Sequence, residues 1–202
     1  DSQYKVKFNT SLRSAIFGAS GAKAAMQPMN MMRMPTSIVR GRDAAHIDEL
    51  PSQGDFLLWD NAGQPVLLIH GDHDAIVAFY NTCSHRGAPS VTQTRGNRRR
   101  FTCPYHGWSY SRDGELVAIR DPEDFHNLDL SQRGLKPVRC ERFGNLIFVN
   151  FDKDAPALLE WLGPIAAEWE EFQFDNCRLA ARHVFDLNCN WKIAMEANTE
   201  VY

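Results

Sequence analysis

The chain has 202 residues, a formal net charge of −3 and a hydrophobic fraction of 44%, which is typical of a globular protein with one or two packed domains. This nearly balanced charge gives no general attraction to nucleic acid or to anionic membranes. No run of 18 or more apolar residues is present, so we expect no membrane span and no nucleic-acid partner.

The first 40 residues predict an irregular N-terminal arm. Five methionines crowd residues 26–34, and flexible Met side chains are typical of a segment that packs onto a neighbouring surface; a specific binding site is the alternative. The start lacks the apolar stretch of a secretory signal. The chain has five cysteines, and an odd number argues against a disulfide framework. We therefore expect a reducing, cytoplasmic setting.

Short apolar runs between turns predict an all-β region from residue 54 to residue 150. The runs at 66–69 and 76–80 flank the turn Gly71–Asp74 and predict a hairpin. The other runs predict strands at 56–59, 100–102, 108–110, 115–119, 137–140 and 146–149. Many short strands with frequent turns favour a small sandwich or barrel.

The pattern changes after Asp152. Apolar residues at helical spacing predict a helix over 155–172, broken at Gly163-Pro164. A strand is expected at 179–187, and a final helix at 191–202, capped by Asn188 or Asn190. The fold class is therefore α+β. We predict an arm at 1–40, an all-β domain at 41–153, and the beginning of a second, α+β domain at 154–202.

Two motifs carry metal-ligand chemistry. Cys83-Ser-His85 and Cys103-Pro-Tyr-His106 each pair a thiolate with an imidazole in a Gly/Pro loop that follows a strand. Two such loops can clamp one [2Fe–2S] cluster, in which soft thiolates hold one iron and neutral imidazoles hold the other. A structural zinc site is the alternative, because Cys2His2 also suits tetrahedral Zn²⁺. Zinc fingers usually place Cys with Cys and His with His, so the cluster is favoured.

The motifs and their flanks, "CSHRG" and "CPYHGWSY", resemble those of the Rieske non-haem iron ring-hydroxylating oxygenases. They differ from the respiratory-chain Rieske proteins, which have a disulfide where this chain has Ala88 and Tyr105. Those proteins also have a serine hydrogen-bonded to a sulfur where Trp108 stands here, whereas Tyr110 keeps the tyrosine position. Fewer hydrogen bonds to sulfur predict a reduction potential toward the low end of the roughly −150 to +300 mV Rieske range.

The stretch from Asn190 to Tyr202 resembles the helix that opens the catalytic domain of these oxygenases. In that family an acidic residue of this helix links a cluster histidine of one subunit to an iron-ligating histidine of the next. Glu200 stands at this position, so the resemblance implies that it is a catalytic residue. Glu196 shares its helix face, and a solvated face is the alternative for both. Ala197 stands where the family has Asn, so no role is carried over to Asn198.

The resemblance implies the α (oxygenase) subunit of a Rieske oxygenase. A ferredoxin and/or a flavin reductase would supply electrons to the [2Fe–2S] cluster, and Glu200 would connect it to a mononuclear Fe(II) that activates O2 to hydroxylate an aromatic substrate. The ligands of that iron are expected beyond residue 202, so we expect the chain to be the N-terminal portion of a longer protein. The expected assembly is a homotrimer or α3β3.

Two other functions remain open. Glu rather than Asp at position 200 resembles the branch that oxidises quaternary ammonium compounds such as choline, betaine and carnitine. The alternative from another class is a Rieske ferredoxin that only carries electrons, and the extension after residue 153 argues against it.

Several residues carry weaker signals. Arg98–Arg100, just before the second motif, indicates a docking site for an acidic electron donor, or a solvated basic turn. Arg86 lies inside the first motif, where it can tune the potential. The histidines His46, His70, His73, His126 and His183 lack the ligand context. The cysteines Cys140, Cys177 and Cys189 are expected to be buried small apolar residues on strands.

Overall fold

The computed structural model describes residues 6–7, 42–60, 64–181 and 186–187. The chain divides into two units, Thr36–Asp175 and a second that combines Asp1–Pro35 with Asn176–Tyr202. In the second unit, β1 (Val6–Lys7) pairs antiparallel with β12 (Asp186–Leu187). The domain boundaries after residues 40 and 153 remain predictions.

The unit Thr36–Asp175 is built on a seven-stranded sheet whose paired neighbours are all antiparallel. The predicted hairpin is confirmed, because the fourth and fifth strands of the chain pair through their whole length. The strand order is β2 (Arg42–His46), β11 (Leu146–Asn150), β10 (Pro137–Phe143), β5 (Ile76–Tyr80), β4 (Val66–His70), β3 (Asp55–Trp59) and β6 (Arg95–Asn97).

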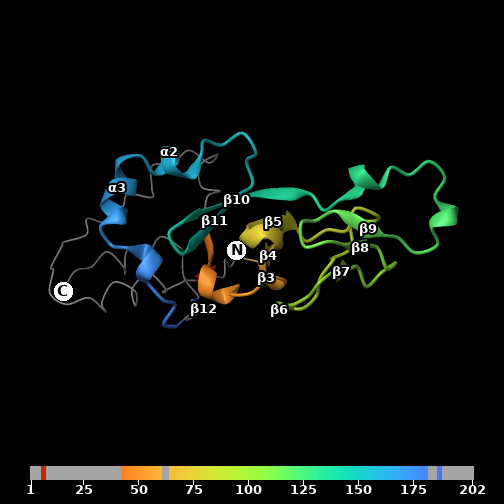
Figure 1. Cartoon of the computed structure of the whole chain (residues 1–202), viewed down its shortest axis with the longest axis horizontal. Coiled ribbons are helices and arrows are strands. Elements are labelled where there is room, and N and C mark those ends of the chain that lie inside the picture. The colour runs from red at the N-terminus through yellow and green to blue at the C-terminus, as the bar shows by residue number, and fades with distance from the viewer. Residues whose placement is uncertain (1–5, 8–41, 61–63, 182–185, 188–202) are drawn as a thin grey trace. The chain divides into compact units, whose positions relative to one another are not determined.

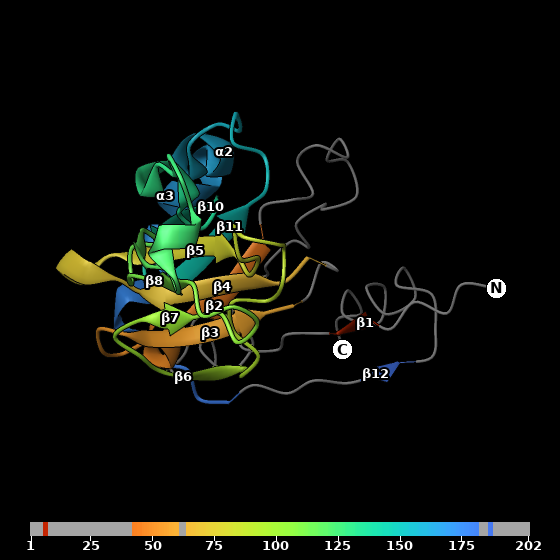
Figure 2. The ribbon, with the colours of Figure 1, turned by 90° about the vertical axis from the view of Figure 1, so that its right-hand side faces the viewer.

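A smaller three-stranded sheet carries the second metal motif. Its strands, in order, are β7 (Phe101–Thr102), β8 (Ser109–Tyr110) and β9 (Leu116–Ala118). The second motif forms the connection between β7 and β8, and the first motif follows β5. Figure 1 shows this sheet at one end of the unit and the α-helices at the other, and Figure 2 views the unit from the end that carries this sheet.

The inner strand β4 has a separate apolar core on each of its faces. Because side chains alternate between the two faces of a strand, Leu67 and Ile69 enter one core while Val66 and Leu68 enter the other. All four are fully buried, and each such burial contributes roughly 1.5–3 kcal/mol to stability. The core on the Leu67 side also contains both motif cysteines. The two motif cysteines therefore pack over one face of the large sheet.

Two short helices follow the last strand of the sheet. They are α2 (Leu158–Leu162) and α3 (Pro164–Glu170), and Gly163 separates them with a φ of +54°. The helix over 155–172 with a break at Gly163-Pro164 is therefore confirmed, although its ends are shorter. None of the helices in the described ranges has the length and apolarity that a membrane crossing requires.

Other expectations need correction or lie outside the described residues. Of the strand predicted at 179–187, Asp186–Leu187 is a strand, residues 179–181 have no regular structure, and residues 182–185 lie outside the described residues. The final helix at 191–202 lies outside the described residues. Short 3-10 helices that were not predicted occur at η2 (Ile47–Glu49), η3 (Asp72–Asp74), η4 (Pro122–Asp124), η5 (Leu130–Arg133) and η6 (Phe174–Asn176).

Candidate metal centre

The first motif forms a closed backbone ring. The Cys83 amide donates to the Ala88 carbonyl oxygen at 2.8 Å, and the Gly87 amide donates to the Cys83 carbonyl oxygen at 2.9 Å. Gly87 has a φ of +75°, a conformation that costs an L-residue about 1–2 kcal/mol, which explains the glycine. The ring holds the Cys83 and His85 side chains on one tight turn.

The second motif repeats the same ring. The Cys103 amide donates to the Trp108 carbonyl oxygen at 2.8 Å, and the Gly107 amide donates to the Cys103 carbonyl oxygen at 3.0 Å. Gly107 has a φ of +73°. The ring spacing is identical in the two loops, but the histidine comes two residues after the cysteine in the first and three residues after it in the second, at His106.

The two cysteines lie together in the interior. Cys83 and Cys103 are both buried, in the same apolar core. Burial raises the pKa of the Cys83 thiol, and the neighbouring Cys103 raises it further, while hydrogen bonds from the Tyr110 hydroxyl and the His85 backbone partly oppose this. Thiols in such a place release their protons when a metal takes their position. Cys83 is therefore suited to a metal and poorly suited to free thiolate chemistry.

The two imidazoles also face one another. The ring centres of His85 and His106 are 4.7 Å apart, with an interplanar angle of 66°. Both Nδ1 atoms are buried and lack a hydrogen-bond partner among the described residues. Burial lowers the pKa of His85, and the positive charges on His106 and Arg86 lower it further. The neutral imidazole is the form that binds a metal, and buried nitrogens of this kind normally have a partner.

A third buried atom without a partner lies beside these ligands in sequence. It is the hydroxyl oxygen of Ser90, which is fully buried. The preceding residue, Pro89, has its carbonyl oxygen 3.9 Å from Cys103 Sγ. The buried side-chain polar atoms without partners in the described part of the chain are thus two predicted ligand nitrogens and one nearby hydroxyl.

The donor set fits a two-iron cluster better than a single ion. In the described ranges, no three His, Cys, Asp or Glu side chains converge on one point where an ion could sit. Structural zinc needs four ligands around one ion, whereas a Rieske cluster takes two thiolates on one iron and two imidazoles on the other. The lack of a convergent donor set among the described residues therefore argues against the zinc alternative.

Aromatic side chains position the first histidine. His85 stacks on Trp108 with 4.7 Å between ring centres and an interplanar angle of 6°. Phe125 packs its ring edge against His85 at 5.9 Å and against Trp108 at 5.7 Å. Trp108 belongs to the opposite loop, so the second loop helps to orient the histidine of the first. Sequence reasoning missed Phe125, because no local pattern connects the segment after β9 with the motifs.

The two sulfurs have different neighbours. The Tyr110 hydroxyl lies 3.0 Å from Cys83 Sγ, and Tyr110 is fully buried. Burial raises the pKa of the Tyr110 hydroxyl, and the neighbouring Cys83 raises it further. The hydroxyl therefore stays protonated and can donate a hydrogen bond. The tyrosine position singled out in the sequence thus lies on the sulfur of the first loop.

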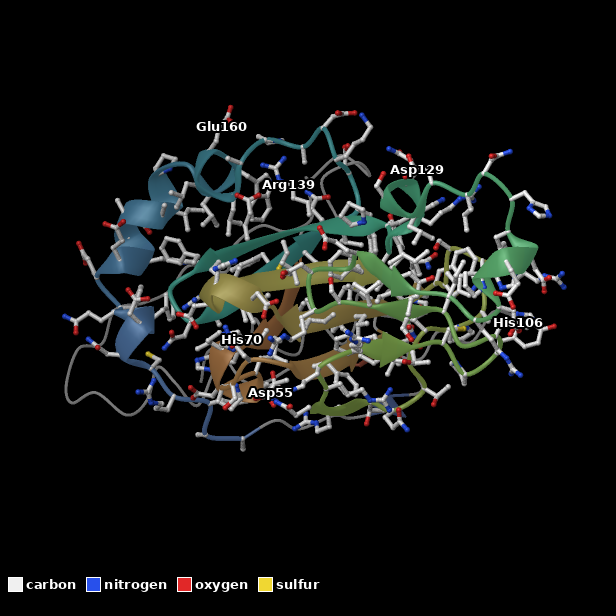
Figure 3. All side chains as sticks on the ribbon, turned by 45° about the vertical axis from the view of Figure 1, so that its right-hand side comes forward. Asp55, His70, His106, Asp129, Arg139 and Glu160 are labelled. Atoms are coloured by element: carbon white, nitrogen blue, oxygen red, sulfur yellow. The ribbon has the colours of Figure 1, made fainter. Side chains whose placement is uncertain are left out.

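The second histidine lies near the surface. Tyr105 covers His106 with 3.8 Å between ring centres, and Tyr105 is 60% exposed. Figure 3 shows His106 at one end of the unit, whereas His70 lies toward the other end on the large sheet. The exposed aromatic ring beside His106 is one part of the candidate centre that solvent or a partner can reach.

The remaining histidines have other environments. His70 is buried, with Nδ1 2.8 Å from the Leu50 carbonyl oxygen and Nε2 2.9 Å from Asp74 Oδ1, so both of its nitrogens serve the fold. The Nδ1 of His46 accepts from the Asp48 amide and caps η2. His73 and His126 are exposed, and His183 lies outside the described residues.

Of the other cysteines and carboxylates singled out in the sequence, Cys140 and Cys177 lie within the described residues. Cys140 lies on β10 but is half-buried. Cys177 is also half-buried and follows η6 without lying on a strand, so the expectation of buried strand cysteines is wrong there. Cys189, Glu196 and Glu200 lie outside the described residues.

The basic run Arg98–Arg100, before the second loop, contains one arginine with contacts inside the fold and two exposed arginines. Arg98 donates to Gln93 Oε1 at 2.6 Å and lies 5.5 Å from the centre of the Phe56 ring, so it is engaged within the fold. Arg99 and Arg100 are exposed, and so is Arg86 in the first loop. A docking role is left to these exposed arginines and remains a prediction.

Comparison with known proteins agrees with this geometry. Residues 42–140 match the family model of the Rieske [2Fe-2S] domain. The glycine betaine monooxygenase oxygenase subunit of Chromohalobacter salexigens is 36% identical over 156 residues, which is 76% of this chain and 34% of the relative. The α subunit of 2-aminobenzenesulfonate 2,3-dioxygenase of Alcaligenes sp is 37% identical over 165 residues, which is 78% of this chain and 41% of the relative.

Solved structures give the same result. A quaternary ammonium Rieske monooxygenase in complex with L-carnitine matches with a TM-score of 0.72 and 28% identity, over 79% of this chain and 46% of that one. A naphthalene 1,2-dioxygenase with indole bound matches with a TM-score of 0.60 and 33% identity, over 64% of this chain and 30% of that one. The chain thus spans less than half the length of these relatives. Over the part that it spans, the chain belongs to the Rieske oxygenases, and it carries a Rieske [2Fe-2S] domain, which implies a [2Fe–2S] cluster as its cofactor.

Proposed function

We propose that the chain is the N-terminal portion of a Rieske oxygenase α subunit whose cluster is held by Cys83, His85, Cys103 and His106. The observation that carries this proposal is the pair of buried Nδ1 atoms without partners among the described residues, on imidazole rings 4.7 Å apart, together with two thiols buried in one core. When bound, the cluster supplies a one-electron carrier with a potential above that of all-cysteine clusters. We keep residues 41–153 as the extent of this domain and 154–202 as the beginning of the catalytic domain.

The residues around the ligands have separate tasks in this proposal. Trp108 and Phe125 fix the plane of the His85 ring. The Tyr110 hydroxyl donates to Cys83 Sγ and stabilises added negative charge. Tyr105 shields one face of His106 while leaving its neighbourhood open to a redox partner. These contacts hold the ligand geometry still during electron transfer.

We assign the onward step to Glu200, on the resemblance of residues 190–202 to the helix that opens the catalytic domain. Its carboxylate would connect a cluster histidine of one subunit to a ligand of the mononuclear iron in the next. This role requires a head-to-tail homotrimer or α3β3 assembly, with electrons supplied by a reductase or ferredoxin. A cytoplasmic location is retained as part of the proposal.

The substrate that we propose is aromatic, with hydroxylation by activated O2. Similarity to an aminobenzenesulfonate dioxygenase and to a naphthalene dioxygenase supports this class. Oxidation of a quaternary ammonium compound is the second candidate. Relatives named for glycine betaine and, in Escherichia coli at 31% identity, for carnitine support it, as does the glutamate at position 200. Identities of 37% and 36% do not separate the two classes.

A substrate panel tests the proposal. The complete polypeptide that contains these residues is reconstituted with iron and a reductase system, and O2 uptake and products are measured. The panel contains naphthalene, 2-aminobenzenesulfonate, glycine betaine and L-carnitine. Uptake that depends on an aromatic compound supports the first candidate, and a trimethylamine or demethylated product supports the second. A reducible cluster that never supports substrate oxidation would identify an electron carrier instead.

A matched pair of variants tests the link to the mononuclear iron. Glu200→Gln is expected to abolish product formation while the cluster is still reduced and reoxidised normally. Glu196→Gln, on the same predicted helix face, is the control and should retain more activity. Equal activity in wild type and Glu200→Gln would remove Glu200 from the pathway.

A further inference from the structure

We propose that Ser84, between the two predicted ligands of the first loop, competes with Cys83 Sγ for the proton of Tyr110 and thereby lowers the potential of the cluster. The inference rests on the proposed role of Cys83 as a cluster ligand. Ser84 itself is not one of the ligands, and it acts as a positioning residue through Tyr110.

The Tyr110 hydroxyl has three neighbours at the same distance. Cys83 Sγ, the Ser84 amide nitrogen and the Ser84 Oγ each lie 3.0 Å from it. The amide can only donate, so it uses one lone pair of the phenol oxygen. The phenol has a single proton for the remaining two neighbours. Which of them receives it depends on what the Ser84 hydroxyl does with its own proton.

The Ser84 proton has another destination. Ser84 Oγ lies 2.5 Å from the carbonyl oxygen of Arg133, at the end of η5. A carbonyl oxygen only accepts, so Ser84 donates there. The Ser84 oxygen then presents only lone pairs to Tyr110. As a cluster ligand, Cys83 Sγ is a thiolate and also only accepts. The Tyr110 proton is therefore shared between a sulfur and an oxygen.

This sharing has a defined effect on the redox centre. One-electron reduction adds negative charge, and hydrogen bonds donated to the sulfurs stabilise the reduced form. A proton drawn toward Ser84 Oγ donates less to Cys83 Sγ, so the reduced form is less stabilised. The Arg133 carbonyl thus weakens the one tyrosine hydrogen bond through Ser84. Removing the serine hydroxyl commits the Tyr110 proton to sulfur and raises the potential.

The test is a redox titration of the loaded protein, followed by EPR of the reduced cluster. Ser84→Ala is expected to shift the midpoint potential upward, and Tyr110→Phe is expected to shift it downward. In the Tyr110→Phe background, Ser84→Ala is expected to cause no further shift, because the proton in dispute is gone. Ser84→Thr keeps the hydroxyl and should titrate like the wild type. If Ser84→Ala does not load, Ser84→Gly serves as the second variant without the hydroxyl.

A second serine provides the control. Ser109 lies on the same strand as Tyr110, and its hydroxyl bonds with Thr102 Oγ1 at 2.8 Å and the Gly107 carbonyl at 3.2 Å. Ser109→Ala should leave the potential unchanged.

Resonance Raman supplies an independent readout of the same bond. Transfer to D2O should shift the Fe–S(Cys) bands more in Ser84→Ala than in wild type, because the exchangeable Tyr110 proton then binds sulfur alone. An unchanged or lowered potential in Ser84→Ala, or an equal upward shift without the Tyr110 hydroxyl, would overturn the inference. A wild-type protein without iron and acid-labile sulfide would instead defeat the proposed function on which it rests.

Discussion

The two ligand loops have the same backbone and different surroundings. Residues 83–88 and 103–108 close rings with identical hydrogen-bond spacing, and each ring turns on a glycine of nearly equal φ. Yet the histidine is offset by one position between them. The rings therefore set where the ligands stand, and the side chains packed on each loop decide how each ligand behaves.

The sulfurs illustrate this difference. Cys83 Sγ has the Tyr110 hydroxyl at 3.0 Å, which can donate to it. Cys103 Sγ has the Pro89 carbonyl oxygen at 3.9 Å, which can only accept. Added negative charge is therefore better stabilised on the first loop than on the second. The redox properties of the centre depend on side chains more than on the backbone rings.

The two histidines also differ in the aromatic side chain that packs against each of them. His85 is stacked on Trp108, which is 3% exposed, whereas His106 lies against Tyr105, which is 60% exposed. The first histidine is thus fixed by the core and the second is covered from solvent by one ring. Variants of the two loops test these differences.

Loss of a cysteine ligand from either loop should prevent the chain from holding the cluster at all. Cys83→Ser and Cys103→Ser are each expected to lose nearly all cluster iron, since both loops contribute to one [2Fe–2S] group. Iron and acid-labile sulfide are measured per chain. Cys140→Ser is the control and should keep the wild-type iron content, because Cys140 packs against the other core, on the Val66 side of the large sheet. Retention of half the iron in either loop variant would contradict the shared site.

The two aromatic supports should differ strongly in their effect on stability. Trp108→Ala removes a buried ring from the core beside His85 and should cost about 3–5 kcal/mol of unfolding free energy. Tyr105→Ala removes an exposed ring from His106 and should cost within about 0.5 kcal/mol. Denaturant unfolding of the loaded protein measures both. Similar costs for the two variants would show that the loops are equally anchored.

The glycines should behave alike, because the backbone rings are alike. Gly87→Ala and Gly107→Ala each place a side chain at a left-handed φ and should cost about 1–2 kcal/mol. An added Cβ would have no close neighbour at either position, the nearest atoms lying at 4.0 Å and 3.8 Å, so the cost is conformational. Asn at the same positions tolerates that φ and should recover part of the loss. Thermal unfolding of the Ala and Asn variants at both positions measures these costs.

The smallest effect concerns the approach of the electron donor. Reversing the charges of Arg99 and Arg100, beside the second loop, should slow reduction by an acidic donor roughly threefold at low salt, and less at physiological ionic strength. Stopped-flow reduction at two salt concentrations measures this. The double variant Arg142→Glu/Lys153→Glu reverses the same number of charges and is the control, since Arg142 is an exposed residue of β10 and Lys153 an exposed residue after β11. Equal slowing by the control would assign the effect to net charge alone.

The hairpin strands and the helix break follow from strong local signals in the sequence. Two continuous apolar runs on either side of a turn predict β4 and β5, and Gly163-Pro164 marks where α2 ends. Two strands of the large sheet escape prediction because their sequences lack an apolar run: β2 reads RDAAH, and β6 reads RGN with every residue exposed. Both are held by pairing with a neighbouring strand, which no local pattern reports.

For the candidate site, too, local sequence predicts the ligands but not the residues that support them. The Cys and His spacing predicts the four ligands, since that chemistry is encoded within each loop. The contacts that tune them come from elsewhere: Phe125 follows β9, and the Arg133 carbonyl ends η5. These segments meet the loops only in the folded chain, so their roles need the structure.

The central claim is that two imidazole nitrogens, one from each loop, bind the same iron of a two-iron cluster. Pulsed EPR of the dithionite-reduced protein, labelled with ¹⁵N at the histidine Nδ position, tests it directly. We predict two strongly coupled Nδ nitrogens in the wild type. A loaded cluster with one coupled histidine nitrogen, or with none, would contradict the account.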